Sequence, residues 1–437
     1  MIERYSVPDM KAVWDRKNRF SIMKDVEVAL VSAWGQMGEV PRDSVLNIKN
    51  NATFTLERVD ELERITDHDV VAFINALGET VGDDACYIHK GATSSDILDT
   101  ATSIQIVRAG NILKADLKSL LETVKLRAIE FKHTPMMGRT HGIHAEPMTF
   151  GLKMLSWYAE LSRDMTRLES AIEMNRVGKM SGAVGTYSNL HPDLERAMCD
   201  ELGLKPDPVS TQVISRDRHA QYLLALAQVG ASIERIAVSL RTEQRTEIGA
   251  VEEAFGKGQT GSSAMPHKKN PKTSEQLTGL SRVLRSNALA GLENVALWDE
   301  RDISHSSVER IILPDSSILT SYMLKKMNDI ISGLVVHEDR MRKIIDITGG
   351  AIFSGRFLVS LMSRGLSRTR AYQIVQRLAI PASKGKGHLR QLALDDPETQ
   401  SILGEAEIES IFDLDYYLRY IDTIFYKVLE ETDEQAI

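Results

Sequence analysis

Long runs of apolar residues at helical spacing constrain the fold of this chain more than any other feature. Apolar side chains recur every three or four residues from Ile106 to Val124, and again from Tyr222 to Leu240, without an intervening proline. This spacing places the apolar side chains on one face of an α-helix. Similar stretches occur near residues 150–177, 273–298 and 315–345, and strand signals are rare. The sequence therefore predicts an all-α fold with a central bundle of long helices, extended by partner subunits.

Polar and glycine-rich segments divide this helical pattern. Three of them interrupt the central block, at residues 133–147, 178–218 and 256–272. We expect shorter helices before residue 94 and after the Gly349-Gly350 pair. The sequence therefore predicts three helical domains, which span residues 1–93, 94–349 and 350–437. The long-helix bundle belongs to the central domain.

Composition narrows the class of function. A net charge of −8 and an isoelectric point near 5.8 argue against nucleic acid as the main partner, because binding to a phosphate backbone requires a basic surface. The two cysteines, Cys86 and Cys199, are too few for a disulfide framework and too far apart for a metal knuckle. No apolar run has signal-peptide or membrane-spanning length, so we expect a cytoplasmic protein that does not bind membranes.

Residues 261–271 carry the strongest chemical signal. They read Gly-Ser-Ser-Ala-Met-Pro-His-Lys-Lys-Asn-Pro, which places two hydroxyls close to a histidine, two lysines and an amide. The segment is too polar for a core, and its glycine and prolines exclude a helix interior. We expect a loop that presents Ser262 or Ser263 as a nucleophile or base beside cations that hold an anion. This arrangement indicates an enzyme.

The glycines before this loop match a dinucleotide-binding pattern. Gly256, Gly258 and Gly261 satisfy G-x-G-x-x-G, which requires a strand before the first glycine. Residues 245–255 are instead predicted to be helical. We therefore reject a dinucleotide site and interpret the glycines as hinges of the following loop.

Two histidines, His141 and His144, lie three residues apart in the polar segment 138–148. A zinc site is one interpretation, although no third ligand is close in sequence. A second is a polar helix entry, in which Glu146 precedes Pro147 at the first helical turn. In the third, His141 is a general acid, because histidine titrates closest to neutral pH.

The segment around Thr93 and Ser94 also has two interpretations. Either residue is a good N-cap for the helix that follows. The same helix start offers free N–H groups and a favourable dipole to a carboxylate or phosphate.

Residues 298–315 are dense in ionisable groups. Arg301 and Arg310 would form surface salt bridges that contribute little to stability. In the alternative, they clamp a phosphate or carboxylate together with Ser306 and Ser307.

Taken together, these segments resemble the fumarase/aspartase superfamily. Its signature loop has the form G-S-S-x-M-P-x-K-x-N-P, which residues 261–271 match in full. Thr93-Ser94-x-Asp96 and Gly138-Arg-Thr-His141 match the two other signature regions in the same order. The resemblance covers essentially the entire chain and is weakest after about residue 350.

Finer features favour the adenylosuccinate lyase family within this superfamily. His267 fits that family and also the carboxymuconate cycloisomerase branch. Segments that begin at Arg4-Tyr5, His68-Asp69 and Ser304 resemble the nucleotide-site segments of the family. Gln276, where we expect asparagine, and the loop at residues 383–388 depart from the family pattern.

The resemblance implies β-elimination of fumarate from adenylosuccinate, which gives AMP, and from the succinylated aminoimidazole carboxamide ribotide of purine synthesis. Ser263, or else Ser262, would remove a proton beside a carboxylate, which leaves a carbanion in its aci-carboxylate form. Lys268 would stabilise this anion. His141, oriented by Glu275, would protonate the leaving nitrogen. The chemistry requires no metal and no organic cofactor.

The resemblance also implies the residues that bind the substrate. His68 and His89 would support binding near the phosphate and the succinyl carboxylates, and Ser263 and Lys268 would contact the substrate during catalysis. The other implied binding residues are Arg4, Tyr5, Asp67, Asp69, Thr93, Ser94, Gln212, Lys269, Asn270, Gln276, Arg301, Ser306, Ser307, Val308, Glu309 and Arg310.

Family members are homotetramers with a three-domain fold and a twenty-helix core. Three subunits contribute the three signature segments to each active site, so the resemblance implies a homotetramer here with small-molecule nucleotide substrates. Another superfamily lyase or a carboxymuconate-type cycloisomerase is the alternative enzyme. A catalytically silent helical scaffold is the non-enzymatic alternative, and the joint presence of Ser263, His141, Lys268 and Glu275 argues against it.

Overall fold

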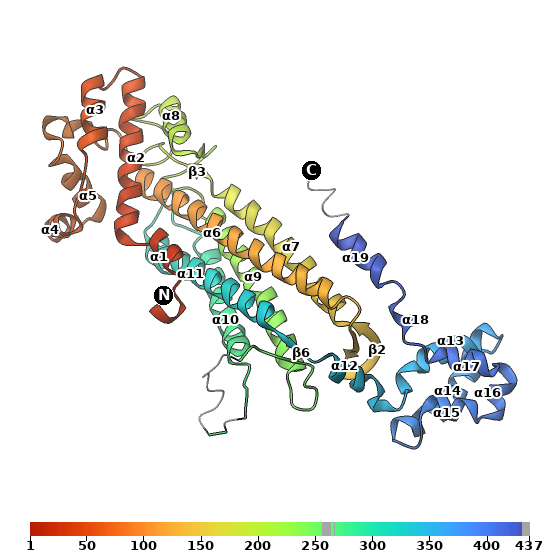
Figure 1. Cartoon of the computed structure of the whole chain (residues 1–437). Helices are drawn as coiled ribbons and strands as arrows, with labels where there is room; N and C mark the ends of the chain where they lie inside the picture. The colour runs from red at the N-terminus through yellow and green to blue at the C-terminus, as the bar shows by residue number, and fades with distance from the viewer. Residues whose placement is uncertain (256–263, 266, 431–437) are drawn as a thin grey trace. The chain divides into compact units, whose positions relative to one another are not determined.

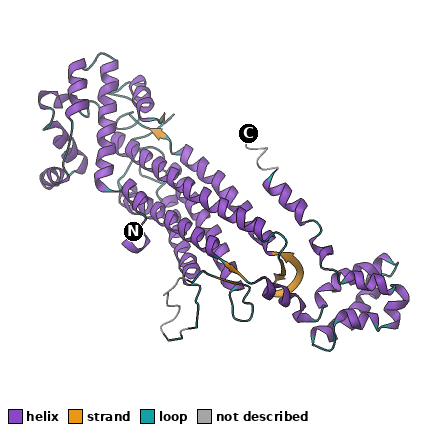
Figure 2. Ribbon diagram, viewed as in Figure 1, coloured by secondary structure: helices purple, strands orange, loops and turns teal. Residues whose placement is uncertain are grey.

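The computed structural model describes residues 1–255, 264–265 and 267–430. In this part of the chain helices dominate and strands are short, so the predicted helical fold is confirmed (Figure 2). The chain forms two compact units, and the predicted division into three domains stays a prediction. Unit 1 comprises Met1–Ser119, Arg163–Glu234 and Leu277–Lys326, and unit 2 comprises Leu120–Ser162, Arg235–Gln276 and Met327–Ile437.

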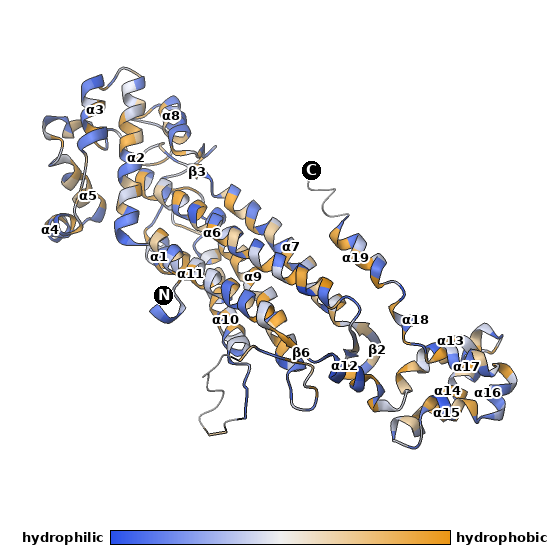
Figure 3. Cartoon of the chain, viewed as in Figure 1, coloured by the Kyte–Doolittle hydropathy of each residue, from blue (hydrophilic) through white to orange (hydrophobic). Residues whose placement is uncertain are grey.

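Long helices appear at the positions that the apolar periodicity predicts (Figure 1), except that the stretch near 315–345 is not one helix, because the long helix ends at Gly333 and the next begins at Glu338. They are α6 (Ser94–Glu130), α7 (Phe150–Met174), α9 (Asp217–Glu243), α10 (Lys272–Glu293) and α11 (Ser304–Gly333), and each contributes residues to both units. Hydrophobic and hydrophilic residues are interspersed along them (Figure 3), as in helices that bury one face. By length and composition alone α9 could cross a membrane, but 61% of its most apolar window is buried inside the structure.

Unit 1 adds N-terminal helices to its share of the bundle, and all of them but the 21-residue α2 are short. Its further elements are η1 (Glu3–Tyr5), α1 (Pro8–Val13), α2 (Arg16–Gln36), α3 (Arg42–Asn51), α4 (Leu56–Thr66), α5 (Asp69–Gly78), η2 (Gly82–Tyr87), β3 (Val177–Gly178), α8 (Pro192–Leu202) and β4 (Lys205–Pro206). Strands β3 and β4 are parallel. The core joins α2 to α5, where Phe20 stacks on Phe73 with ring centroids 5.2 Å apart. This packing fixes the helices that precede the first signature region.

Unit 2 contains the remaining strands and the C-terminal helices. Its further elements are β1 (Pro135–Thr140), β2 (Ile143–Thr149), β5 (Val251–Glu252), β6 (Val335–Val336), α12 (Glu338–Ile345), η3 (Asp346–Thr348), η4 (Ala351–Phe353), α13 (Ser354–Ser363), α14 (Arg368–Ser383), α15 (Leu389–Leu394), α16 (Pro397–Ile402), α17 (Glu405–Ile411), α18 (Asp415–Leu418) and α19 (Ile421–Leu429). A separate apolar core around Phe357, Leu361 and Ile374 holds α13 and α14 together.

The helix entry considered for Glu146 and Pro147 is wrong. Both residues lie in β2, which pairs antiparallel with β1, and α7 begins only at Phe150. The connecting turn is His141-Gly142, whose φ angles of 54° and 78° are both left-handed. Two such residues in succession form the tight turn that matches the twist of paired strands. The hairpin therefore places His141 at its tip.

The helix predicted over residues 245–255 is also wrong. Helix α9 ends at Glu243, and Val251–Glu252 form the short strand β5. This strand pairs antiparallel with β6, whereas a dinucleotide fingerprint follows a strand of a parallel sheet. The glycines at 256, 258 and 261 lie outside the described residues.

A fully buried ion pair organises the first signature region. The ammonium group of Lys179 contacts a carboxylate oxygen of Asp96, and neither side chain is exposed to solvent. Asp96 Oδ1 also accepts the backbone N–H of Ser181 at 3.1 Å, and Oδ2 accepts that of Thr93 at 2.8 Å. Lys179 donates a second bond to the Gly182 carbonyl at 3.0 Å. The pair thus ties the start of α6 to the segment after β3.

We predict that Lys179→Met lowers the free energy of unfolding by about 3 to 5 kcal/mol, because it leaves the Asp96 carboxylate buried without its cation. Urea unfolding followed by circular dichroism measures the change. The control is Lys205→Met, which breaks an exposed pair with Glu173 and should change stability by at most about 1 kcal/mol. Equal effects of the two substitutions would contradict the structural role of the buried pair.

Candidate active site

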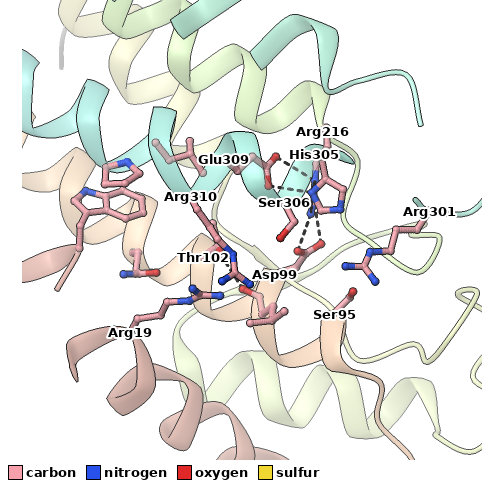
Figure 4. Close-up of a pocket in the computed structure, with 15 residues that line it drawn as sticks. Arg19, Ser95, Asp99, Thr102, Arg216, Arg301, His305, Ser306, Glu309 and Arg310 are labelled. Carbon is pink, nitrogen blue, oxygen red and sulfur yellow. Dashed lines mark hydrogen bonds and ion pairs between the residues drawn. The ribbon is translucent and has the colours of Figure 1, made fainter. Parts of the chain in front are cut away.

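A cavity of about 190 Å³ lies within unit 1 where α2, α6 and the start of α11 come together (Figure 4). Pockets that enclose a whole small ligand measure ~300 to 1,000 Å³, so this one suits one end of a larger ligand. Its lining residues are Trp14, Arg19, Ser95, Leu98, Asp99, Thr102, Gln105, Arg216, Arg301, His305, Ser306, Glu309, Arg310, Leu313 and Pro314.

The N-terminal turns of α11 supply much of the polar wall. The helix begins at Ser304, well before the apolar stretch predicted from residue 315, and it continues through Pro314. Asp302 caps it by accepting the Ser304 backbone N–H at 2.7 Å. Hydrogen bonds from Ser304 and Trp298 lower the pKa of Asp302 to about 2. Helical spacing then places Ser306 and Arg310 on one face, four residues apart.

Beneath this wall, Arg216 forms the centre of a buried network. It donates to both carboxylate oxygens of Asp99 at 2.7 and 2.8 Å, and it lies 3.2 Å from Glu309. His219 Nδ1 lies 2.9 Å from Glu309, and His305 Nδ1 lies 3.1 Å from Arg216. The network therefore connects α6, α9 and α11 inside unit 1.

The two carboxyl groups of the network remain ionised. Burial by itself would raise the pKa of Glu309, but the charge and hydrogen bond of His219, with His305 and Arg216, hold it far below the usual range. Burial likewise opposes ionisation of Asp99, and Arg216 lowers the pKa of that group. The partners of both carboxylates lie within the network, so the acids leave little negative charge on the pocket.

Three other arginines, Arg19, Arg301 and Arg310, face the same pocket. Arg310 Nη2 donates to Asp69 at 2.8 Å, and Arg301 Nη1 donates to Gln212 at 3.0 Å. Burial by itself would raise the pKa of Asp69, but the hydrogen bond and charge of Arg310 keep it below its usual value. Arg301 Nε is buried and has no hydrogen-bond partner among the described residues. The pocket is therefore cationic and suits an anion.

The structure brings together part of the set predicted for unit 1. Arg301, Ser306, Glu309 and Arg310 line the pocket. Asp69 and Gln212 contact it through Arg310 and Arg301. The other predicted residues of this unit are not among its lining residues: Arg4, Tyr5, Asp67, His68, His89, Thr93, Ser94, Ser307 and Val308.

Several of those residues have local structural roles. The Tyr5 ring packs edge-on against Tyr322, with centroids 5.3 Å apart. Asp67 ends α4 in a left-handed conformation with φ 50°. His68 caps α5 by accepting the Val71 N–H at 3.4 Å. Ser94 begins α6, so both structural and functional interpretations of this helix start remain open.

His89 forms a second polar cluster in unit 1, with a buried carboxylate. Its Nδ1 lies 2.7 Å from Glu27 Oε1, and its backbone N–H donates to Glu27 Oε2 at 2.9 Å. Glu27 is buried on α2, and His89 has a left-handed φ of 60°. Burial alone would lower the pKa of His89, but Glu27 raises it above its usual value of 6.5. The carboxylate therefore fixes the ring and favours its cationic form.

Unit 2 contains the remaining predicted catalytic and binding residues. His141 is exposed at the tip of the hairpin, and the adjoining Arg139 lies 3.4 Å from the buried carboxylate of Glu243. The zinc interpretation gains no support, because no cluster of three potential ligands occurs among the described residues. Ser262 and Ser263 lie outside the described residues.

The end of the signature loop is anchored within unit 2. Lys269 pairs with Glu252 at 2.8 Å, and its carbonyl accepts a hydrogen bond from Gln244 at 3.1 Å. Lys268 is exposed and Asn270 is partly exposed. Glu253 caps α10 by accepting the Ser274 N–H at 2.8 Å. The first turn of this helix carries the predicted residues Glu275 and Gln276.

Comparison with known proteins identifies the family of this chain. Residues 4–285 match the family described as Lyase, and residues 350–428 match the adenylosuccinate lyase C-terminus. The adenylosuccinate lyase of Thermotoga maritima is 48% identical over 431 residues, which cover 99% of this chain and 100% of that protein. The chain belongs to the adenylosuccinate lyase family. Family members from Bacillus subtilis and Aquifex aeolicus are 46% and 47% identical and cover 97% and 98% of this chain, each over 99% of its own length. The chain is therefore an enzyme of the lyase class.

Solved structures confirm the superfamily fold. The fumarate lyase from Mesorhizobium sp. BNC1 has a TM-score of 0.89 and 28% identity, with 98% of this chain and 99% of that chain covered. The 3-carboxy-cis,cis-muconate lactonizing enzyme from Pseudomonas putida has a TM-score of 0.90 and 26% identity, with 99% and 98% covered. The chain thus shares its architecture with a fumarate lyase and with a muconate lactonizing enzyme.

Sequence reasoning missed several residues that line the pocket. Arg19 lies in a run of charged residues that reads as a solvated helix face, and Arg216 lies in a segment predicted to be a polar join. Neither has a motif around it. No feature of the sequence alone would have identified either arginine.

We predict a pH-dependent effect of Glu27→Gln on stability. A raised His89 pKa stabilises the folded protein fully below pH 6.5, and this stabilisation disappears as pH rises through the raised value. The wild type should therefore exceed Glu27→Gln by about 1.5 to 3 kcal/mol below pH 6.5, with a shrinking difference at higher pH. Urea unfolding at pH values from about 5.5 to 9, which span the titration of a histidine, measures this difference in stability.

The matched control is Glu39→Gln, which removes the exposed partner of Lys90. Its effect should be small and flat across the same pH range, because solvent screens that pair. A pH-independent difference for Glu27→Gln would show that the carboxylate contributes packing alone.

Proposed function

We propose that this enzyme cleaves adenylosuccinate to AMP and fumarate, and cleaves the succinylated aminoimidazole carboxamide ribotide by the same elimination. Both substrates combine a phosphate with a succinyl group on nitrogen. The observation that carries the proposal is the pocket in which Arg301, Arg310 and Ser306 face a cavity sized for one end of a ligand. Membership of the adenylosuccinate lyase family supports the same substrates.

In the proposed reaction, a base removes a proton from the carbon next to a carboxylate of the succinyl group. The electron pair enters that carboxylate, then expels the nitrogen and forms the double bond of fumarate. Fixed cations must stabilise the intermediate dianion. Ser263 is our choice for the base and Ser262 the second candidate, with Lys268 as the cation that favours ionisation of the serine hydroxyl.

His141 is the proposed general acid for the leaving nitrogen. The hairpin holds it in a left-handed turn, and Arg139 beside it is fixed by Glu243, so the strand before the turn has a defined position within unit 2. Glu275 is the proposed partner that orients the imidazole. Lys269, Asn270 and Gln276 complete the proposed contacts to the succinyl carboxylates.

Phosphate and ribose binding are proposed for the pocket of unit 1 and the residues near it. Arg301, Ser306 and Arg310 would bind the phosphate, because guanidinium groups donate pairs of hydrogen bonds to its oxygens. Asp69 and Gln212 would then exchange partners with the substrate, since each now bonds one of these arginines. Arg4, Tyr5, His68 and His89 are proposed contacts around the remaining substrate.

We further propose a cytoplasmic homotetramer whose subunits share active sites. Helix α10 exposes Val283, Leu289 and Leu292, and Val295 follows it, whereas an isolated surface helix normally turns such side chains inward. A partner subunit would cover this apolar stretch. The signature segments of three chains would then form each site.

A carboxymuconate-type cycloisomerase remains the second candidate, because a lactonizing enzyme shares the fold at 26% identity. An ultraviolet assay of the purified protein separates the two. We expect loss of adenylosuccinate with AMP and fumarate as products, and no turnover of carboxymuconate, argininosuccinate, aspartate or malate. Turnover of carboxymuconate without cleavage of adenylosuccinate would overturn the proposed function.

We predict that Ser263→Ala lowers kcat roughly 100- to 10,000-fold, because it removes the proposed base. Ser262→Ala is the matched control and should keep most of the activity. Affinity for AMP, measured by calorimetry, should be unchanged in both variants. The reverse ranking of the two substitutions would assign the base to Ser262.

A further inference from the structure

Among the described residues, Arg19 is a cation of the pocket that forms no ion pair. It projects from α2 into the cavity wall that also contains Arg301 and Arg310 (Figure 4). Its guanidinium has no hydrogen-bond or ion-pair partner among the described residues, whereas Arg310 bonds Asp69 and Arg301 bonds Gln212.

The other acids near the pocket do not balance this charge. Asp99 and Glu309 are both engaged by Arg216, and Glu309 also by two histidines. The charge of Asp69 attracts Arg19, but its hydrogen bond goes to Arg310. Once these contacts are assigned, the described structure leaves the pocket with excess positive charge, and Arg19 contributes to it.

Burial makes that charge unfavourable in the empty pocket. Removal from solvent is the larger cause of a lowered Arg19 pKa, and the like charge of Arg310 is the next. Arginine nevertheless stays protonated at any physiological pH. Two guanidinium groups held near each other and partly shielded from water form a favourable position for an anion with more than one negative charge.

Arg19 also has a fixed position. Asp15 caps the start of α2 by accepting the Lys17 N–H at 2.9 Å, and the next side chain after Arg19, Phe20, is buried against Phe73. The backbone that carries Arg19 is therefore set by the core of unit 1. The Cα–Cβ bond of Arg19 therefore points toward the pocket in the absence of a ligand, and no backbone rearrangement is needed on binding.

We propose that Arg19 binds the phosphate of the nucleotide together with Arg310 and makes the pocket selective for phosphorylated ligands over the corresponding nucleosides. This inference rests on the proposed function and deepens it, because it adds a specificity-determining residue. The charge chemistry favours a phosphate in its doubly ionised form, which carries two negative charges above its second pKa of about 6.

The test compares Arg19→Gln with the wild type in two inhibition experiments. AMP and adenosine share the base and the ribose and differ in the phosphate. We expect Arg19→Gln to weaken inhibition by AMP roughly 10- to 100-fold, as for loss of a hydrogen bond between charged groups. The inhibition constant of adenosine should change by less than about twofold, because adenosine lacks the phosphate that Arg19 is proposed to bind. A general disturbance of the pocket would weaken both ligands equally and would overturn the proposal.

Arg16→Gln is the matched control. Arg16 lies one turn before Arg19 on α2, but it pairs with Asp60 at 2.5 Å and does not line the pocket. The Arg16→Gln variant should bind AMP and adenosine with the affinity of the wild type. Arg19→Lys should recover part of the affinity for AMP, because the charge remains while the planar fork is lost.

The outcomes separate this inference from the proposed function. Failure of the wild type to cleave adenylosuccinate would reject the proposed function, and calorimetric binding of AMP, adenosine and inorganic phosphate would still test Arg19. Cleavage by the wild type with unchanged AMP affinity in Arg19→Gln would reject the inference alone.

A melting temperature of Arg19→Gln at or above that of the wild type excludes misfolding as the cause of weaker AMP binding. If Arg19→Gln melts below the wild type, the ratio of AMP to adenosine affinity decides, and an unchanged ratio rejects the inference.

Discussion

Burial of the Arg216 guanidinium is the constraint on which the pocket of unit 1 depends. A cation this far from water is tolerated only where carboxylates surround it, and Asp99 and Glu309 supply them from two different helices. Because Asp99 lies on α6 and Glu309 on α11, neither helix can slide without breaking a charge-assisted bond. The register of α11 decides which of its residues face the cavity. Arg216 therefore sets the directions of Ser306 and Arg310, while its own hydrogen bonds go to the buried network.

Unit 1 contains two kinds of charged side chain, which differ in how deeply they are buried. Deep charges such as Asp96 and Lys179 have complete sets of partners and serve to hold elements in place. Charges nearer the cavity have incomplete sets, and Arg19 and Arg301 are the examples. Incomplete pairing near a cavity is unfavourable in the empty protein, and a ligand of the opposite charge relieves it. This difference in pairing distinguishes a binding surface from structural ion pairs better than the number of charges does.

Apolar periodicity sufficed to predict the long helices, because a buried face repeats over many turns and produces a signal that local exceptions do not erase. The hairpin at His141 was missed, since its strands contain glycine and proline and its turn uses histidine where asparagine is usual. The early start of α11 was missed because its first turns bury ionisable groups rather than apolar ones. Motif resemblance supplied Arg301, Ser306 and Arg310. Arg19 and Arg216 could be found only in three dimensions. Arg216 pairs with Asp99 and Glu309, which are distant from it in sequence, and Arg19 meets the other arginines of the pocket only in the fold.

The bond between Asp69 and Arg310 has a consequence for discrimination among anions. The carboxylate is tethered to α5 and is always present beside the guanidinium, so it behaves as an internal competitor at a fixed and high effective concentration. In the proposed phosphate site, a small singly charged ion such as chloride would have to displace this carboxylate with a single contact. An anion displaces it only when further contacts elsewhere in the enzyme add to its affinity. The proposed site would therefore favour a ligand held at several points of the enzyme over free chloride.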